Sequence, residues 1–171
     1  MADMSKVAGL QDVLRQQKGL QSITSRINAA TGIRQMIAEI CPLLIDLFRV
    51  EAAHVFVREK NRQDVYTFTG QTGDVKTVLG PQTLPGYIAN EGKMIHISDF
   101  NKSDQIEAYR DFPVSGGGDS RFGLPVRQIL AMPIFYGGEI LGAVEVLNKK
   151  EDGPFGEKEP ALLQNISELL G

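Results

Sequence analysis

The stretch Arg127–Lys149, RQILAMPIFYGGEILGAVEVLNK, decides the fold. Two apolar runs flank the adjacent residues Gly137 and Gly138, and a pair of glycines between such runs is a strong signal for a tight β-hairpin. The second run ends at Asn148 and Lys149 and is apolar along most of its length, as in a buried strand. The stretch therefore predicts two antiparallel strands joined by a short turn.

Upstream of this hairpin, the sequence changes to a second β-rich region. The runs AAHVFVRE (52–59) and DVYTFTG (64–70) are joined by the polar turn KNRQ, which predicts another hairpin, and VKTVLG (75–80) is interpreted as a third strand. The segment 81–93, PQTLPGYIANEGK, predicts a short helix because Pro85 stands near its first turn and Gly92 past its end. A brief strand, MIHISDF (94–100), follows.

Helices are predicted at both ends of the chain. The second helical segment, Ile33–Val50, has an apolar face, and Pro42 inside it should kink the helix or divide it in two. The last segment, 155–171, predicts a helix whose inward side is formed by Leu162, Leu163, Ile166, Leu169 and Leu170. Between the strands, Asn101–Phe112 is expected to form one or two helical turns, and 113–125 a Gly-rich loop.

The first helix is predicted over Val7–Ala30, and its role stays open at this point. Val13, Leu20 and Ile27 recur every seven positions, but polar residues interrupt the neighbouring seam. The helix either lies on its own domain or pairs with a second copy, because polar seam positions weaken a coiled coil without forbidding it.

The order of these elements predicts an α+β fold. A central, largely antiparallel sheet of about six strands is expected, with the N- and C-terminal helices on one face. Short helices and irregular loops would form a pocket on the other face, since binding sites often lie in loops that a regular scaffold supports.

Composition narrows the function classes. The chain has 171 residues, a net charge of −3 and 42% hydrophobic residues, which fits one globular domain with an appended helix and gives no argument for a nucleic-acid or membrane partner. No apolar run approaches the ~20 residues of a membrane span, and the N-terminus has no secretory apolar region. The single cysteine, Cys41, is interpreted as a buried apolar residue. A cytoplasmic location is expected.

Catalytic signatures are missing from the sequence. There is no nucleophile-elbow serine, no phosphate-binding loop and no histidine pair with metal spacing, so the chain is not expected to be an enzyme or to carry a metal or cofactor. His54 and His96 both lie in strand-like runs, where a histidine is more often a core or pocket residue than a catalyst.

The second half of the chain resembles the GAF domain, a small-molecule-binding module of cyclic-nucleotide phosphodiesterases, adenylyl cyclases and bacterial signalling regulators. The resemblance covers about residues 32–171, whereas residues 1–31 match the helix that commonly precedes this domain. It is carried by four pieces in the family's order, which are LPGYIANEG (84–92), IHISD (95–99), QILAMPI (128–134) and GEILGAVEVLNK (138–149). The resemblance implies a GAF-like fold and a regulatory sensor function.

Departures from the family's patterns separate the subtypes. The irregular segment has no cysteine for a covalent bilin, and the several cysteines of the free methionine sulfoxide reductase branch are absent. Cyclic-nucleotide-binding members carry an Asn-Lys…Phe…Asp-Glu motif. Here Asn148, Lys149 and Phe155 match it, Glu159 stands in place of the Asp with the same charge, and Pro160 stands where the motif has its last acid. The resemblance implies that these residues tie the last strand to the last helix behind the pocket, through a Lys–acid pair and a buried ring.

The resemblance also places candidate ligand residues in this chain. The positions are on two strands, on the short helix and in the irregular segment: His54, Phe68, Leu84, Ile88, Asp119, Arg121 and Val126. Asp119 falls where nucleotide-binding members have an acid, Val126 where several of them have a Thr, and the Arg121 guanidinium would attract a phosphate or carboxylate.

Two hypotheses follow from the resemblance. In the first, the chain is a sensor that binds a small molecule, best identified as a cyclic nucleotide, and relays its state through the terminal helices as a homodimer to a downstream effector domain or protein. In the second, it is a GAF fold without a ligand that serves dimerisation or protein docking.

Overall fold

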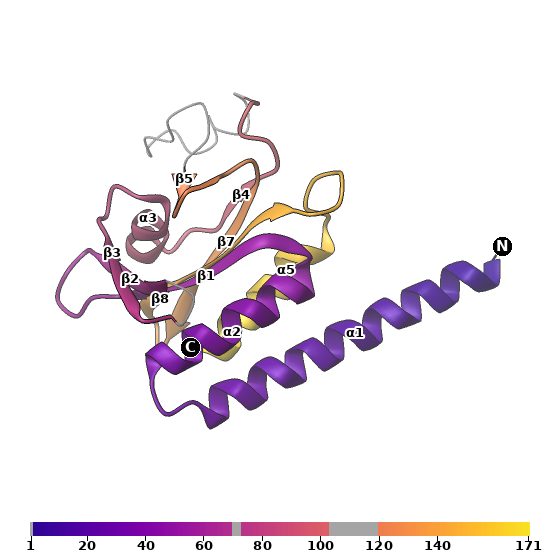
Figure 1. Ribbon diagram of the computed structural model, residues 1–171, viewed down its shortest axis with the longest axis horizontal. Coiled ribbons are helices and arrows are strands. Elements are labelled where there is room, and N and C mark those ends of the chain that lie inside the picture. Colours follow the sequence, from indigo (N-terminus) through magenta and orange to yellow (C-terminus); the bar gives the residue numbers. More distant parts are fainter. Residues whose placement is uncertain (1, 70–72, 103–119) are drawn as a thin grey trace.

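The computed structural model describes residues 2–69, 73–102 and 120–171 (Figure 1). Its elements are, in chain order, α1 (Ala2–Ala29), α2 (Ile33–Phe48), β1 (Val50–Arg58), β2 (Val65–Thr69), β3 (Val75–Leu79), α3 (Leu84–Glu91), β4 (Ile95–Ile97), β5 (Ser120–Arg121), β6 (Leu124–Pro125), β7 (Ile129–Tyr136), β8 (Glu139–Lys149) and α5 (Lys158–Leu170). Most of the expected helical turns at 101–112, and residues 113–119 of the Gly-rich loop, lie outside the described residues.

The predicted antiparallel sheet is confirmed. Six strands pair in the order β3-β2-β1-β8-β7-β4, and every pair is antiparallel. The hairpin predicted within Arg127–Lys149 joins β7 and β8 through Gly137 (φ 58°) and Gly138 (φ 85°). This left-handed backbone explains why both positions are glycines. Strands β1 and β8 lie in the middle of the sheet, which is why the second apolar run is buried on both sides.

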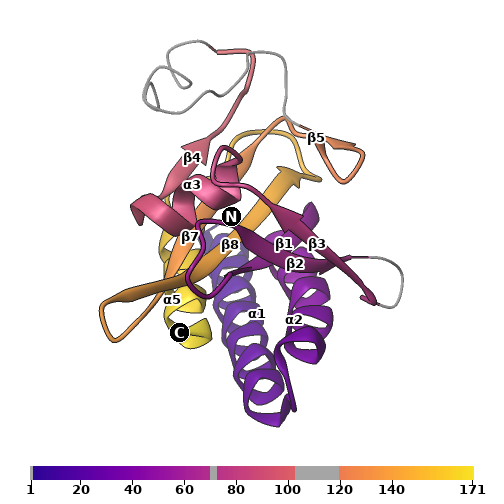
Figure 2. The same cartoon turned by 90° about the vertical axis from the view of Figure 1, so that its left-hand side faces the viewer.

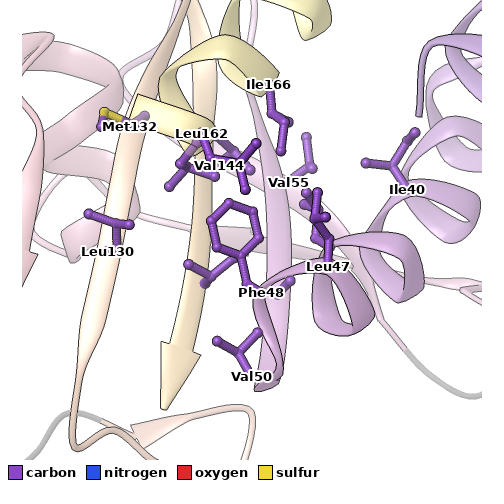
Figure 3. Packing of buried hydrophobic residues seen from close by; sticks show 14 of the residues in the cluster. Ile40, Leu47, Phe48, Val50, Val55, Leu130, Met132, Val144, Leu162 and Ile166 are labelled. Carbon is purple, nitrogen blue, oxygen red and sulfur yellow. The ribbon is translucent and has the colours of Figure 1, made fainter. Parts of the chain in front are cut away.

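The terminal helices α1, α2 and α5 lie together on one side of the sheet, as predicted, and α3 lies on the other (Figure 2). We call these sides the helix-covered face and the α3 face. The helix-covered face holds the larger apolar cluster, in which Ile40 and Leu47 of α2 and Ile166 of α5 pack on Val55 and Val144 of the central strands (Figure 3). Burial of this layer supplies most of the driving force for folding.

Two details of the helices differ from the predictions. Of the two outcomes expected at Pro42, a kink or a division into two helices, the division is wrong, because α2 continues as one α-helix through Pro42. Pro42 is exposed, and water can therefore take the carbonyl that loses its N–H partner there. At the chain's end, Leu169 is 39% exposed and does not face the core, whereas Leu163 and Ile166 are fully buried.

Helix α1 has a docked half and a projecting half. Leu20, Ile23 and Ile27 pack against the helix-covered cluster, and Arg15 Nη1 donates to the Leu47 carbonyl oxygen at 2.9 Å. The N-terminal half extends away from the sheet (Figure 1) and exposes Met4, Val7, Leu10, Val13 and Leu14. The helix thus lies on its own domain along one half, and pairing with a second copy stays a prediction. Within the described residues, no helix is both long and apolar enough to cross a membrane.

Candidate functional site

Helix α3 forms the apolar cover of the α3 face. Thr83 caps the start of the helix, since its Oγ1 accepts a hydrogen bond from the Gly86 N–H at 3.2 Å, and Gly92 ends the helix with a left-handed φ of 67°. Leu84 and Ile88 point from it into a cluster with Val126 and with apolar side chains of β7 and β8. Three of the predicted ligand residues are thereby brought together, and in this structure all three are buried.

A buried acid and a histidine lie side by side on this same face. Glu145 Oε1 is 2.9 Å from His54 Nδ1, and the two residues are direct partners in the β1–β8 register. The Glu145 side chain is 1% exposed and that of His54 16%. Glu145 alternates along β8 with Val144 and Val146 of the helix-covered face, which puts it on the α3 face.

Burying a carboxylate costs free energy that a nonpolar residue at the same place would not cost. A central strand that keeps one therefore marks a candidate binding site.

A short hairpin covers the histidine. Strands β5 and β6 are joined by Phe122 and Gly123, and the Phe122 ring lies edge-on to the His54 ring with 4.9 Å between the centroids. Phe122 has a φ of 52°, in the left-handed region that a bulky residue rarely adopts, and it is 43% exposed. An unfavourable backbone conformation at a half-exposed aromatic residue is typical of functional positions, and here it directs a ring onto the buried pair.

Thr67 adds a second buried polar group. It alternates along β2 with Tyr66 and Phe68 and shares its side of the strand with Val65, which packs with Ala89 of α3. Thr67 is 1% exposed, and its Oγ1 has no hydrogen-bond partner among the described residues. The hydroxyl thus lies on the α3 face and makes no hydrogen bond to the described residues.

The far end of β8 is organised by Asn148, which is fully buried and has a φ of 55°. Its side-chain amide contacts the start of β1 and the residues that connect β6 to β7. One partner, Glu51, also binds Arg127 through an Oε1–Nη2 contact of 3.0 Å. The hydrogen bond from Arg127, followed by the one from Asn148, holds the pKa of the Glu51 carboxyl below its usual value.

The remaining residues of the predicted tie lie next to Asn148. Lys149 Nζ is 3.1 Å from Glu159 Oε1 in the first turn of α5, and it also contacts the Pro154 carbonyl oxygen at 3.3 Å. Phe155 is 4% exposed and belongs to the helix-covered cluster. The group therefore lies behind the sheet with respect to His54 and Glu145, at the junction of β8 and α5.

Other predicted site residues are placed differently. Phe68 packs against the helix-covered cluster, on the opposite side of the sheet from His54, so the structure does not bring these two residues together. The strand's alternation decides this, because a side chain changes face with every residue. Asp119 lies outside the described residues, and Arg121 is described only as part of the β5 backbone.

Sequence reasoning missed Glu145 and Phe122. Glu145 had a signal, since it is the single charged residue within the apolar run ILGAVEVL of a strand that the sequence predicts to be buried. Phe122 gave no such signal. The local sequence predicts neither its left-handed backbone nor its contact with His54, which lies 68 positions away.

The described residues offer little covalent or metal chemistry. Burial raises the pKa of the Cys41 thiol to about 12, which leaves it protonated and unreactive at neutral pH. No group of three His, Cys, Asp or Glu side chains in the described part of the chain is arranged to hold a metal ion. The α3 face instead brings together a buried carboxylate–histidine pair and a half-exposed aromatic ring.

Comparisons with known proteins agree with this architecture. The family model of the GAF domain matches residues 32–171. The GAF domain of an Acinetobacter phosphoenolpyruvate-protein phosphotransferase superimposes with a TM-score of 0.65 at 16% identity, over 91% of this chain and 89% of that one. A methyl-accepting chemotaxis protein fragment gives 0.64 at 17% identity, over 86% and 91%. The free methionine-R-sulfoxide reductase of Neisseria meningitidis, solved with its substrate, gives 0.63 at 13% identity, over 91% and 85%.

Proposed function

The chain belongs to the GAF domain family, and from that premise we propose that residues 32–171 form a regulatory sensor domain that binds a small molecule on the α3 face. One observation carries the proposal: the buried Glu145–His54 pair lies on a central strand pair under the strained, half-exposed ring of Phe122. An apolar side chain at position 145 would make a more stable sheet, so retention of the acid is best explained by a ligand.

The proposed ligand is a cyclic nucleotide. Its base would stack against Phe122, and its N–H groups would donate to the Glu145 carboxylate. A carboxylate only accepts hydrogen bonds, so it fits the two adjacent donors of a guanine edge better than the mixed donor and acceptor of adenine. Leu84, Ile88 and Val126 would supply the apolar wall, and Asp119 and Arg121 complete the proposed set.

We propose that the terminal helices relay the bound state in a homodimer. The support is the row of exposed apolar residues along the projecting half of α1. A groove of about 680 Å³ between the docked half of α1 and α5, lined by Leu20 and Leu169 among others, lies further along the same helix. A ligand changes the output only if it binds two helix arrangements with different affinity. The output would go to an effector domain or protein, and a cytoplasmic location fits these roles.

A regulatory role is favoured over catalysis because the described site has an acid–histidine pair but no reactive thiol. The free methionine-R-sulfoxide reductase shares the fold, but at 13% identity it carries no argument about activity. The alternative function, a ligand-free domain for dimerisation or docking, is favoured by the burial of Leu84 and Ile88 in the present packing.

Thermal shift tests the ligand directly. Cyclic GMP, cyclic AMP and a panel of small metabolites are added to the intact chain, and binding at about 100 times the dissociation constant should add about 2.7 kcal/mol of stability. We expect cyclic GMP to give the largest shift. The isosteric variant Glu145→Gln should weaken the binding of cyclic GMP by at least about tenfold, since it loses the charge that strengthens the hydrogen bonds. Its thermal shift should be smaller as a result.

The control variant is Glu159→Gln, which removes a carboxylate from the tie at α5 and leaves the α3 face intact. It should change the melting temperature without changing the dissociation constant. A flat response to the whole panel would support the docking function instead.

The dimer is tested by Leu10→Glu, a charge placed on the projecting half of α1 at a residue that is 62% exposed. Sedimentation should show a shift towards monomer, because a charge in an apolar helix interface is strongly unfavourable. Gln11→Glu, an exposed neighbour, is the matched control and should leave the mass unchanged. Equal masses for both variants would contradict pairing through this half of α1.

A further inference from the structure

We propose that Asn148 is a positioning residue of the ligand site, which holds the β5–β6 hairpin so that the Phe122 ring stays against His54. The biological meaning of this inference rests on the proposed function, since a ligand would have to enter beneath the same ring. The geometry itself stands without a ligand and can be tested without one.

The Asn148 side chain uses all of its hydrogen-bonding capacity. Its Oδ1 accepts from the Arg127 N–H at 2.7 Å and from the Gln128 N–H at 3.0 Å. Its Nδ2 donates to Glu51 Oε2 at 2.9 Å and to the Pro125 carbonyl oxygen at 2.8 Å. An amide has two acceptor sites and two donors, so every one of them is occupied. Aspartate lacks the donors and leucine lacks all four groups, which makes asparagine the residue that fits this position.

Three of these four contacts fall on one short segment. Pro125 is the last residue of β6, and Arg127 and Gln128 come immediately before β7. Asn148 therefore binds the base of the β5–β6 hairpin, at the point where the chain passes from the hairpin into β7. The same segment includes Val126, which is buried in the cluster beneath α3.

The hairpin needs such support because it is small. β5 and β6 are two residues each and pair only with one another, in the registers Ser120↔Pro125 and Arg121↔Leu124. A two-stranded ribbon of this length is not stable by itself in water. Its direction, and with it the place of the Phe122 ring, is consequently set by the residues that hold its base.

The backbone at Asn148 offers a clean way to remove the side chain. Its φ of 55° is a conformation that glycine adopts without strain, so Asn148→Gly deletes the four hydrogen bonds and keeps the main chain. Asn61 has a φ of 61° in the exposed turn before β2. Asn61→Gly is therefore the same chemical change at the same kind of backbone, away from the hairpin, and serves as the matched control.

The experiment uses a fluorescent reporter at the hairpin's tip. The chain contains four tyrosines but no tryptophan, so Phe122→Trp introduces a single tryptophan, which can be excited selectively, in place of the ring that lies on His54. Acrylamide quenching of this tryptophan is measured well below the melting temperature, in the reporter alone and with each glycine variant added. Asn148→Gly should raise the quenching constant about twofold or more, because the released hairpin opens on a fast timescale, and Asn61→Gly should leave it unchanged.

Equal quenching in a folded Asn148→Gly protein and in Asn61→Gly would overturn the inference, since a merely stabilising role would lower the melting temperature without exposing the reporter. If Asn148→Gly does not fold, Glu51→Ala decides instead. It removes one partner of the amide at a half-exposed position, and it should raise the quenching constant by a smaller factor, whereas no change would refute the proposal. The reporter result is independent of the ligand panel, so failure of one does not imply failure of the other.

Discussion

The two faces of the sheet differ in the polarity of the side chains that they bury. On the helix-covered face, the central strands contribute apolar residues to the main cluster, with Val55, Val144 and Val146 packed under α1, α2 and α5. On the α3 face, the same strands bury Glu145, and β2 buries Thr67. Apolar burial is sufficient to make a stable fold, whereas buried polar groups cost stability. This difference is what the proposed function requires, with one face that supplies stability and another that gives up some stability at the proposed binding site.

The largest expected effect tests the helix-covered face. Leu44 of α2 is fully buried in its cluster, so Leu44→Ala should lower the free energy of unfolding by about 3 kcal/mol through lost burial and a cavity. Denaturant titration measures it, with Leu141→Ala, at a residue that is 40% exposed, as the control. A loss below about 1 kcal/mol would mean that this face is not the main source of stability.

A smaller loss of stability is expected at the tie between β8 and α5. Lys149→Ala removes a Lys–Glu contact whose side chains are 16% and 23% exposed, and it should lower the free energy of unfolding by about 1–2 kcal/mol. Lys76→Ala removes a Lys–Glu contact in which the lysine is 47% exposed, and it should cost less than about 1 kcal/mol. Equal losses in the two variants would argue against a special role for Lys149 in holding α5.

A gain is expected on the α3 face. Thr67→Val replaces a buried hydroxyl that has no partner among the described residues, and it should raise the free energy of unfolding by about 1 kcal/mol. Thr77→Val is the control, because Thr77 Oγ1 lies 3.1 Å from Thr69 Oγ1 and its removal should destabilise slightly. If Thr67→Val destabilises more than Thr77→Val, the polar group is satisfied and the contrast between the faces is weaker than proposed.

The smallest effect is a pH dependence at the start of β1. The pKa of Glu51 is lower in the folded chain, so its contribution to stability is present above the ordinary carboxyl pKa of about 4.3 and is lost as the pH falls through the folded value. The stability difference between the protein and Glu51→Gln, measured by denaturation, should therefore shrink below about pH 4. A difference that stays constant from neutral pH down to about pH 3 would show that the charge of Glu51 plays no part.

Elements with strong local signals were predictable. The β7–β8 hairpin follows from two glycines between apolar runs, and the short helix α3 from Pro85 near its first turn and Gly92 past its end. The proximity of Lys149 and Glu159 was expected from the family motif, and the two side chains are indeed adjacent. In each case the deciding residues lie within a dozen positions of one another, where local geometry dominates.

The composition of the site depended on long-range register. His54 meets Glu145 across 91 positions of sequence, and a shift of one residue between β1 and β8 would have paired His54 with an apolar residue. The same parity placed Phe68 on the helix-covered face and Thr67 on the α3 face. The turn between β1 and β2 does not determine which face of the sheet each side chain takes. The sequence alone therefore predicted where the strands lie along the chain, but not which of their residues face the proposed pocket.

The central claim is that the α3 face is the binding face, and amide chemical-shift mapping tests it most directly. Cyclic GMP is titrated into the isotope-labelled intact chain, with cyclic AMP as the comparison. If the α3 face binds the nucleotide, saturating shifts are expected at His54, Phe122 and Glu145, with little change at α2 residues such as Leu44 on the opposite face. Shifts that instead gather in the groove between α1 and α5, or no shift with either nucleotide, would contradict it.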